Sequence, residues 1–98
     1  MCGATRGGPS LEGIDIGTQS VIQGIVLSGD DPVGNAYVRL LDADGEFTAE
    51  VPTSATGQFR FFAAPGQWTL RTLAPRVEPV ERAVVARQGD VAEVTVAV

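Results

Sequence analysis

The stretch Thr56–Arg71 reads T-G-Q-F-R-F-F-A-A-P-G-Q-W-T-L-R, and it decides the fold class. Apolar side chains recur at every second position, first at Phe59 and Phe61 and then, after a Pro-Gly pair, at Trp68 and Leu70. Successive side chains of a β-strand point to opposite faces, so this period of two is typical of strands with one buried face. The stretch therefore predicts a β-hairpin in which these four side chains face the core.

The same alternation recurs in the rest of the chain. Further strands are predicted, with turns rich in Gly, Asp and Pro between them, at residues 21–27, 36–41, 47–51, 80–86 and 91–98. The Asp-Gly pair that precedes the strand at 47–51 favours a second hairpin, because such a pair accepts the positive φ angles of a tight turn. The inward side chains of that strand are predicted to be Phe47, Ala49 and Val51.

The number of strands and the chain length together predict the architecture. About seven short strands without any helical period indicate an all-β fold, an antiparallel β-sandwich. A chain of 98 residues can bury one small core. Residues 1–19 are rich in Gly, Ser and Thr and have no sustained period, so we expect a flexible N-terminal arm there and a single folded domain at residues 20–98.

Composition argues against several classes of partner. The formal charge is −5 and the isoelectric point is about 4.4, which disfavours attraction to the phosphates of nucleic acids. No apolar run has the length of a membrane helix, and the N-terminus lacks the apolar segment of a secretory signal. One cysteine, Cys2, cannot form an internal disulfide. We therefore expect a cytoplasmic protein that binds neither nucleic acid nor membrane.

The absence of two residue types bears on catalysis. The chain has no histidine, and all seven of its basic residues are arginines. Histidine is the usual general base near neutral pH and a common metal ligand, and lysine forms Schiff bases and holds phosphates in P-loops. The sequence therefore predicts a protein that is not an enzyme, with no catalytic residues, no metal site and no cofactor.

The outward positions of the central strands form a second pattern. Arginines alternate there with large apolar side chains, a mixture that is enriched at protein interfaces. If their strands share one sheet, these residues lie on one outer face and form a possible interface with a protein partner or with a second copy in a homo-oligomer. The alternative is that the arginines pair with Glu46 or Glu50 across neighbouring strands. The outward residues are Tyr37, Arg39, Leu41, Arg60, Phe62, Arg71 and Leu73.

Several segments of the sequence resemble those of known families. The pattern over residues 20–73 is similar to the carboxypeptidase regulatory-like domain, and this resemblance implies a transthyretin/prealbumin-like Greek-key topology. It rests on Gly24-x-Val26, Ala36-x-Val38-x-Leu40, Thr56-Gly57-x-Phe59-x-Phe61 and Pro65-Gly66-x-Trp68-x-Leu70. More narrowly, the phrases at residues 38–42, 46–51 and 60–66, together with the Met-Cys start, resemble the small actinobacterial SseC-like proteins. That second resemblance implies a link to sulfur metabolism, because the genes of those proteins lie beside thiosulfate sulfurtransferases.

These observations leave three functions open. The first is a non-catalytic accessory module that binds a protein partner, such as a sulfurtransferase. The second is a sulfur-relay protein that carries a persulfide on Cys2, a residue that an extended arm would make accessible. The third is a module that binds a carbohydrate or another ligand, for which Trp68 could provide a stacking surface, although its inward parity favours the core.

Overall fold

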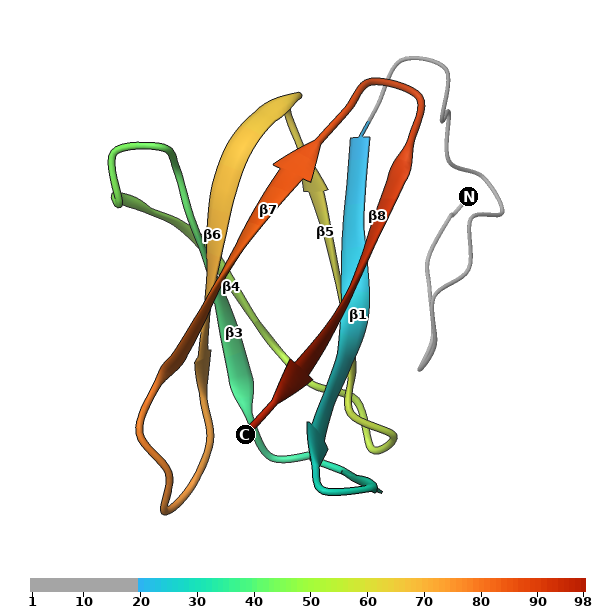
Figure 1. Cartoon of the computed structure of the whole chain (residues 1–98), viewed down its shortest axis with the longest axis vertical. Coiled ribbons are helices and arrows are strands. Elements are labelled where there is room, and N and C mark those ends of the chain that lie inside the picture. Colours follow the sequence, from blue (N-terminus) through green and yellow to red (C-terminus); the bar gives the residue numbers. More distant parts are fainter. Residues whose placement is uncertain (1–19) are drawn as a thin grey trace.

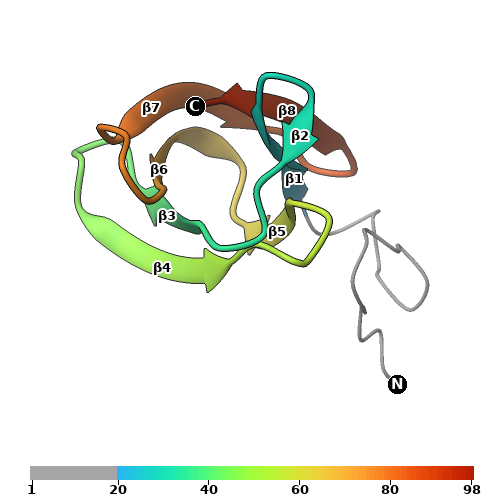
Figure 2. The same cartoon turned by 90° about the horizontal axis from the view of Figure 1, so that it is seen from below.

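The computed structural model describes residues 20–98, and within them every regular element is a β-strand. The arm predicted at residues 1–19, and Cys2 with it, lie outside the described residues. The strands form two sheets that pack face to face (Figures 1 and 2). The elements are β1 (Ser20–Ser28), β2 (Asp31–Pro32), β3 (Tyr37–Leu41), β4 (Phe47–Pro52), β5 (Gln58–Ala63), β6 (Gly66–Leu73), β7 (Val80–Ala86) and β8 (Val91–Ala97). The predicted all-β sandwich is confirmed.

The first sheet is built around β1. This strand pairs with β5 on one side and β8 on the other, and the two-residue β2 pairs with its end. The β1–β8 pair is parallel, whereas every other pairing within residues 20–98 is antiparallel, as predicted. Gly24 allows the close approach of β8, because a Cβ at that position would lie against the carbonyl oxygen of Val94. The position therefore admits no larger residue without moving one of the two strands.

The second sheet has the strand order β4-β3-β6-β7 and is antiparallel throughout. Strands β3 and β4 form the hairpin that the Asp-Gly pair predicts. Gly45 has φ 82°, and its N–H donates to the carbonyl of Asp42 at 2.9 Å. The side-chain Oδ1 of Asp42 accepts two further bonds, from the backbone N–H groups of Asp44 and Glu46. These bonds account for the acidic residues of the turn as turn-forming groups.

Strands β5 and β6 do not form the predicted hairpin. Strand β5 pairs with β1 in the first sheet, whereas β6 pairs with β3 and β7 in the second, so the chain crosses the sandwich at Ala64 and Pro65. Figure 1 shows this connection at the upper end of the molecule. Both strands direct their apolar rows toward the core. The period of two shows which side of each strand is buried. It does not show whether two such strands are neighbours in one sheet or face each other across the core, and the predicted hairpin was wrong for this reason.

The core lies between the two sheets and contains the inward rows of both. Phe59 and Phe61 of β5 are each 4% exposed and Leu70 of β6 is fully buried, as predicted. The two phenyl rings are 6.2 Å apart in a tilted arrangement. Trp68 packs at the margin of this cluster, and its Nε1–H donates to the carbonyl of Ala64 at 2.8 Å. The other members of the buried cluster are Ile22, Val26, Ala36, Val38, Leu40, Ala86, Val94 and Val96.

Candidate functional site

The outer surface of the second sheet gathers most of the predicted interface residues. Tyr37, Arg39 and Leu41 alternate along β3 with buried Val38 and Leu40. Arg71 and Leu73 of the neighbouring strand β6 lie directly opposite Arg39 and Tyr37 in the register. Because β3 and β6 are adjacent and antiparallel, these five residues share one face. We call this surface the β3–β6 outer face.

A row of four charged residues crosses the β3–β6 outer face. Arg39 is paired in register with Glu50 of β4 on one side and with Arg71 of β6 on the other, and Arg71 is paired with Glu81 of β7. The Nε of Arg39 donates to Glu50 Oε2 at 2.7 Å, and Nη1 of Arg71 donates to Glu81 Oε2 at 2.7 Å. The predicted alternative of cross-strand pairing is therefore present, with Glu81 rather than Glu46 as the second acid. Such partly exposed pairs contribute at most about 1 kcal/mol each to stability.

Phe47 also belongs to this face, although the alternation of its strand predicts an inward side chain. It is 61% exposed, and the guanidinium carbon of Arg39 lies 5.9 Å from its ring centroid. The cause is a shift in the pairing of β3 with β4: Leu40 is opposite Ala49, but Leu41 is opposite Phe47. The residue Thr48 is thus skipped, which turns Phe47 outward. Ala49 keeps the predicted inward side, and the prediction for Phe47 is wrong.

The exposed apolar groups of the β3–β6 outer face stand on both sides of the charged row. Tyr37 is 50% exposed and Phe47 is 61% exposed. Val85 lies further along the same face on β7, opposite Gln67, and is 48% exposed. The face therefore offers two aromatic rings and an aliphatic side chain around a row of charge, on a sheet whose backbone hydrogen bonds hold its strands in register.

The other two predicted interface residues lie on the opposite side of the molecule. Arg60 and Phe62 belong to β5, which pairs with β1 in the first sheet. Arg60 donates from Nε to Gln23 Oε1 at 3.2 Å, and burial lowers its pKa below the ordinary value of an arginine. Phe62 is 54% exposed and is opposite Val21 in the register. The seven residues thus do not form one surface, and Arg60 serves the packing of β5 against β1.

Three features bear on other functions: metal ligands, membrane spans and the placement of Trp68. Within residues 20–98, no group of three or more Cys, Asp or Glu side chains is placed to hold a metal ion. No helix long and apolar enough to cross a membrane occurs in the same part of the chain. Trp68 keeps its inward side and its Nε1–H is bonded to Ala64. Cys2 lies outside the described residues, and its role stays a prediction.

Comparison with known proteins identifies the family. A family model described as a protein of unknown function, DUF1416, matches residues 2–98. The chain belongs to the DUF1416 family. Among similar proteins are Rv0814c and Rv3118 of Mycobacterium tuberculosis, each named as an uncharacterized protein, and each 55% identical over 76 residues that cover 76% of both chains. An uncharacterized protein of Mycolicibacterium smegmatis is 59% identical over 63 residues, 63% of this chain and 70% of the relative.

The DUF1416 fold also resembles a solved structure of distant sequence. The major pilin subunit BcpA of Bacillus cereus matches with a TM-score of 0.64 at 10% sequence identity, over 82% of this chain and 29% of the pilin. The chain thus spans less than a third of that subunit's length. At this level of identity the match concerns the fold alone, and it agrees with the β-sandwich described above.

Proposed function

We propose that this DUF1416 protein is a non-catalytic interaction module that binds a protein partner through the β3–β6 outer face. The observation that carries the proposal is the exposure of Phe47 and Tyr37 beside the charged row of the same sheet. Aromatic residues and arginine are enriched at protein interfaces and supply most of their binding energy, whereas the exposed part of a phenylalanine adds nothing to the stability of a free monomer. A partner that covers these rings removes apolar surface from water.

The charged row would give such an interface its orientation. Glu50 and Glu81 already hold Arg39 and Arg71 in fixed positions through bonds of 2.7 Å. Less side-chain entropy is therefore lost when a partner binds. Across the four strands, the two arginines lie side by side in the middle of the row and a glutamate lies at each end. This arrangement favours a partner that places its own acidic groups over the two arginines. Charge complementarity of this kind contributes to specificity and association rate more than to affinity.

We propose a sulfurtransferase as the class of partner. This step rests on the resemblance of residues 38–42, 46–51 and 60–66 to the SseC-like proteins, and on the Met-Cys start that the two have in common. In this proposal the protein assists sulfur transfer as an accessory subunit. The competing hypothesis is that Cys2 itself accepts the sulfur, and a single experiment can separate the two.

The test uses the purified protein and a purified thiosulfate sulfurtransferase from the same organism, with affinity measured by calorimetry. Phe47→Ser should weaken binding by about tenfold or more, the loss of about 1.4 kcal/mol expected when an aromatic anchor of an interface is removed. Phe62→Ser is the matched control, because Phe62 is a similarly exposed phenylalanine on the opposite sheet. It should leave the affinity unchanged. Equal losses for the two variants, or no binding by the unaltered protein, would refute the proposal.

A parallel measurement addresses Cys2. After incubation with thiosulfate and the enzyme, mass spectrometry of the accessory module should show no added sulfur atom, and Cys2→Ser should bind the enzyme as well as the unaltered protein does. Transfer of a sulfur atom to Cys2 would instead favour the relay hypothesis. Light scattering on the free protein tests the homo-oligomer: a dimer that Phe47→Ser dissociates would show that the face binds a second copy.

A further inference from the structure

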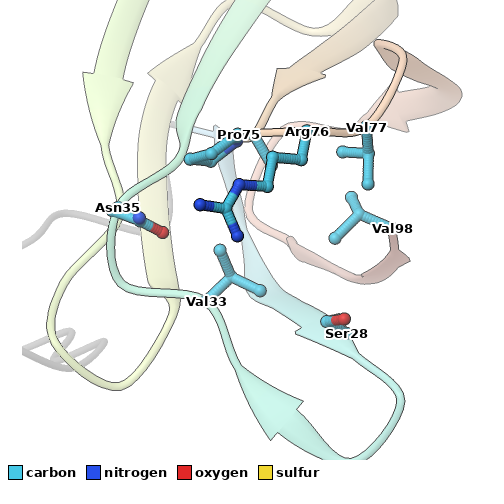
Figure 3. A pocket seen from close by; sticks show the side chains of 8 residues that line it. Ser28, Val33, Asn35, Pro75, Arg76, Val77 and Val98 are labelled. Carbon is cyan, nitrogen blue, oxygen red and sulfur yellow. The ribbon is translucent and has the colours of Figure 1, made fainter.

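A pocket lies at one end of the sandwich, where Asn35 precedes β3 and Ala74 follows β6. It is formed by the last residue of β1, the loop between β2 and β3, the loop between β6 and β7, and Val98. Its volume is about 360 Å³. Figure 3 shows that the guanidinium of Arg76 extends over it toward Val33 and Asn35. Segments that are distant in sequence thus border one open space of a size suited to a small molecule.

Arg76 has an unusual backbone conformation. Its φ is 67°, the only positive φ of a non-glycine residue within residues 20–98. The left-handed region costs an ordinary residue about 1 kcal/mol or more, and glycine adopts it freely. The remaining positive φ angles in the described part of the chain all belong to glycines. A strained arginine at a position suited to glycine points to a use for its side chain.

The guanidinium of Arg76 is also without a partner among the described residues. Arg39 and Arg71 bind glutamates, Arg60 binds Gln23, and Arg82 donates to the carbonyl of Thr95. Arg76 makes no hydrogen bond or ion pair within residues 20–98, even though Glu78 follows two residues later. Its five N–H donors are therefore available to a ligand, and a planar guanidinium matches the geometry of a carboxylate.

The rest of the pocket combines polar and apolar groups. Asn35 and Ser28 contribute an amide and a hydroxyl at its rim, and Val33, Val77 and Val98 form apolar walls (Figure 3). An inorganic oxyanion would satisfy the guanidinium and leave these valines in contact with water. A carboxylate attached to a short branched hydrocarbon chain satisfies both.

We infer that this pocket is a binding site for a small organic carboxylate with an apolar body. The carboxylate accepts two parallel hydrogen bonds from Arg76, and the hydrocarbon chain packs on Val33, Val77 and Val98. The pocket shares no lining residue with the β3–β6 outer face.

The test is a titration followed by amide NMR shifts, with isovalerate as the probe. Isovalerate should cause saturable shifts at Asn35 and Val77, and isopentanol, which has the same branched chain without charge, should not. Arg76→Gly should weaken isovalerate binding by about tenfold or more, as expected for the loss of a charge-assisted pair of hydrogen bonds. The matched control is Arg87→Gly, because Arg87 is another exposed arginine of a loop, at a turn that does not line the pocket. It should bind isovalerate as the unaltered protein does.

Three results would overturn the inference. The first is the absence of saturable shifts at the pocket, and the second is equal weakening by Arg76→Gly and Arg87→Gly. The third is sulfate binding as tightly as isovalerate and in competition with it, since this would assign the pocket to an oxyanion and leave no role for the valines. Phe47→Ser should leave isovalerate binding intact, so failure of this inference and failure of the partner proposal are distinguishable.

Discussion

The outward position of Phe47 predicts that its truncation has a small effect on stability. About two-fifths of its surface is buried, given a 61% exposed fraction. Full burial of a large apolar side chain stabilises a fold by about 1.5–3 kcal/mol, so Phe47 contributes about 1 kcal/mol by burial. The contact with Arg39 at 5.9 Å adds about 0.5–1 kcal/mol. Phe47→Ala should therefore reduce the free energy of unfolding by about 1–2 kcal/mol.

The matched comparison is Phe59→Ala. Phe59 is 4% exposed, and truncation of a buried phenylalanine costs about 3–5 kcal/mol through lost contacts and the cavity that remains. Urea unfolding of both variants, monitored through the fluorescence of Trp68, the single tryptophan, gives the two free energies. If Phe47→Ala is as destabilising as Phe59→Ala, then Phe47 faces the core. That result would refute the shift in pairing at Leu41 and would remove from the β3–β6 outer face its most exposed ring.

Three further substitutions test other parts of the structure. Gly24→Ala should lower the free energy of unfolding by about 3 kcal/mol or more, because its Cβ would meet the carbonyl oxygen of Val94 in the β1–β8 pair; a melting temperature close to that of the unaltered protein would contradict the pairing. Arg76→Gly should raise stability by up to about 1 kcal/mol, since relief of the positive φ exceeds the added entropy of the unfolded chain, and a lower urea midpoint would refute this. Arg39→Ala should reduce the free energy of unfolding by about 1–2 kcal/mol, about half from the bond to Glu50 and about half from the contact with the Phe47 ring. The part due to Glu50 should shrink in high salt, and a cost that does not change with salt would contradict the ion pair.

The positions of the strands could be predicted closely from the sequence. The strand predicted at residues 80–86 coincides with β7, and the one predicted at 91–98 ends one residue beyond β8. These boundaries depend on local information, namely the alternation of side chains and the turn residues that interrupt it. The hairpin of β3 and β4 was predictable for the same reason, since its Asp-Gly turn fixes both the connection and the neighbour.

The sheet membership of β5 and β6 could not be predicted in this way. Their connection through Ala64 and Pro65 has the composition of a turn whether the two strands are neighbours or face each other across the core. Which sheet each strand joins depends on pairing between distant segments: β5 pairs with β1, and β6 pairs with β3. Those pairings join segments far apart in the sequence, and nothing in the local pattern encodes them. The parallel contact of β1 with β8 belongs to the same class.

The candidate site was predictable only where it depended on adjacent strands. Tyr37, Arg39 and Arg71 were correctly grouped because β3 and β6 are neighbours, although the sequence reasoning had no evidence for that adjacency. Phe47 was missed because one skipped residue in a bulge reverses the side on which it lies. Such a shift leaves no signal in a period-two pattern. Arg76 had no distinguishing feature in the sequence, since its backbone conformation and its pocket depend on loop geometry.

The separation of Arg60 from Arg71 has a consequence for any mutational search for the partner. Both arginines occupy outward positions in the alternation of their strands. Arg71 is bonded to Glu81 at an exposed position, whereas Arg60 is bonded to Gln23, which is 7% exposed. Reversing the charge of Arg60 would place a carboxylate against a nearly buried amide, so loss of binding in that variant would report damage to the β1–β5 pair. Reversing Arg71 changes the charged row itself. Variants of Arg71 and Phe47, with Phe62→Ser as the control, therefore test the binding face, and a variant of Arg60 tests the fold.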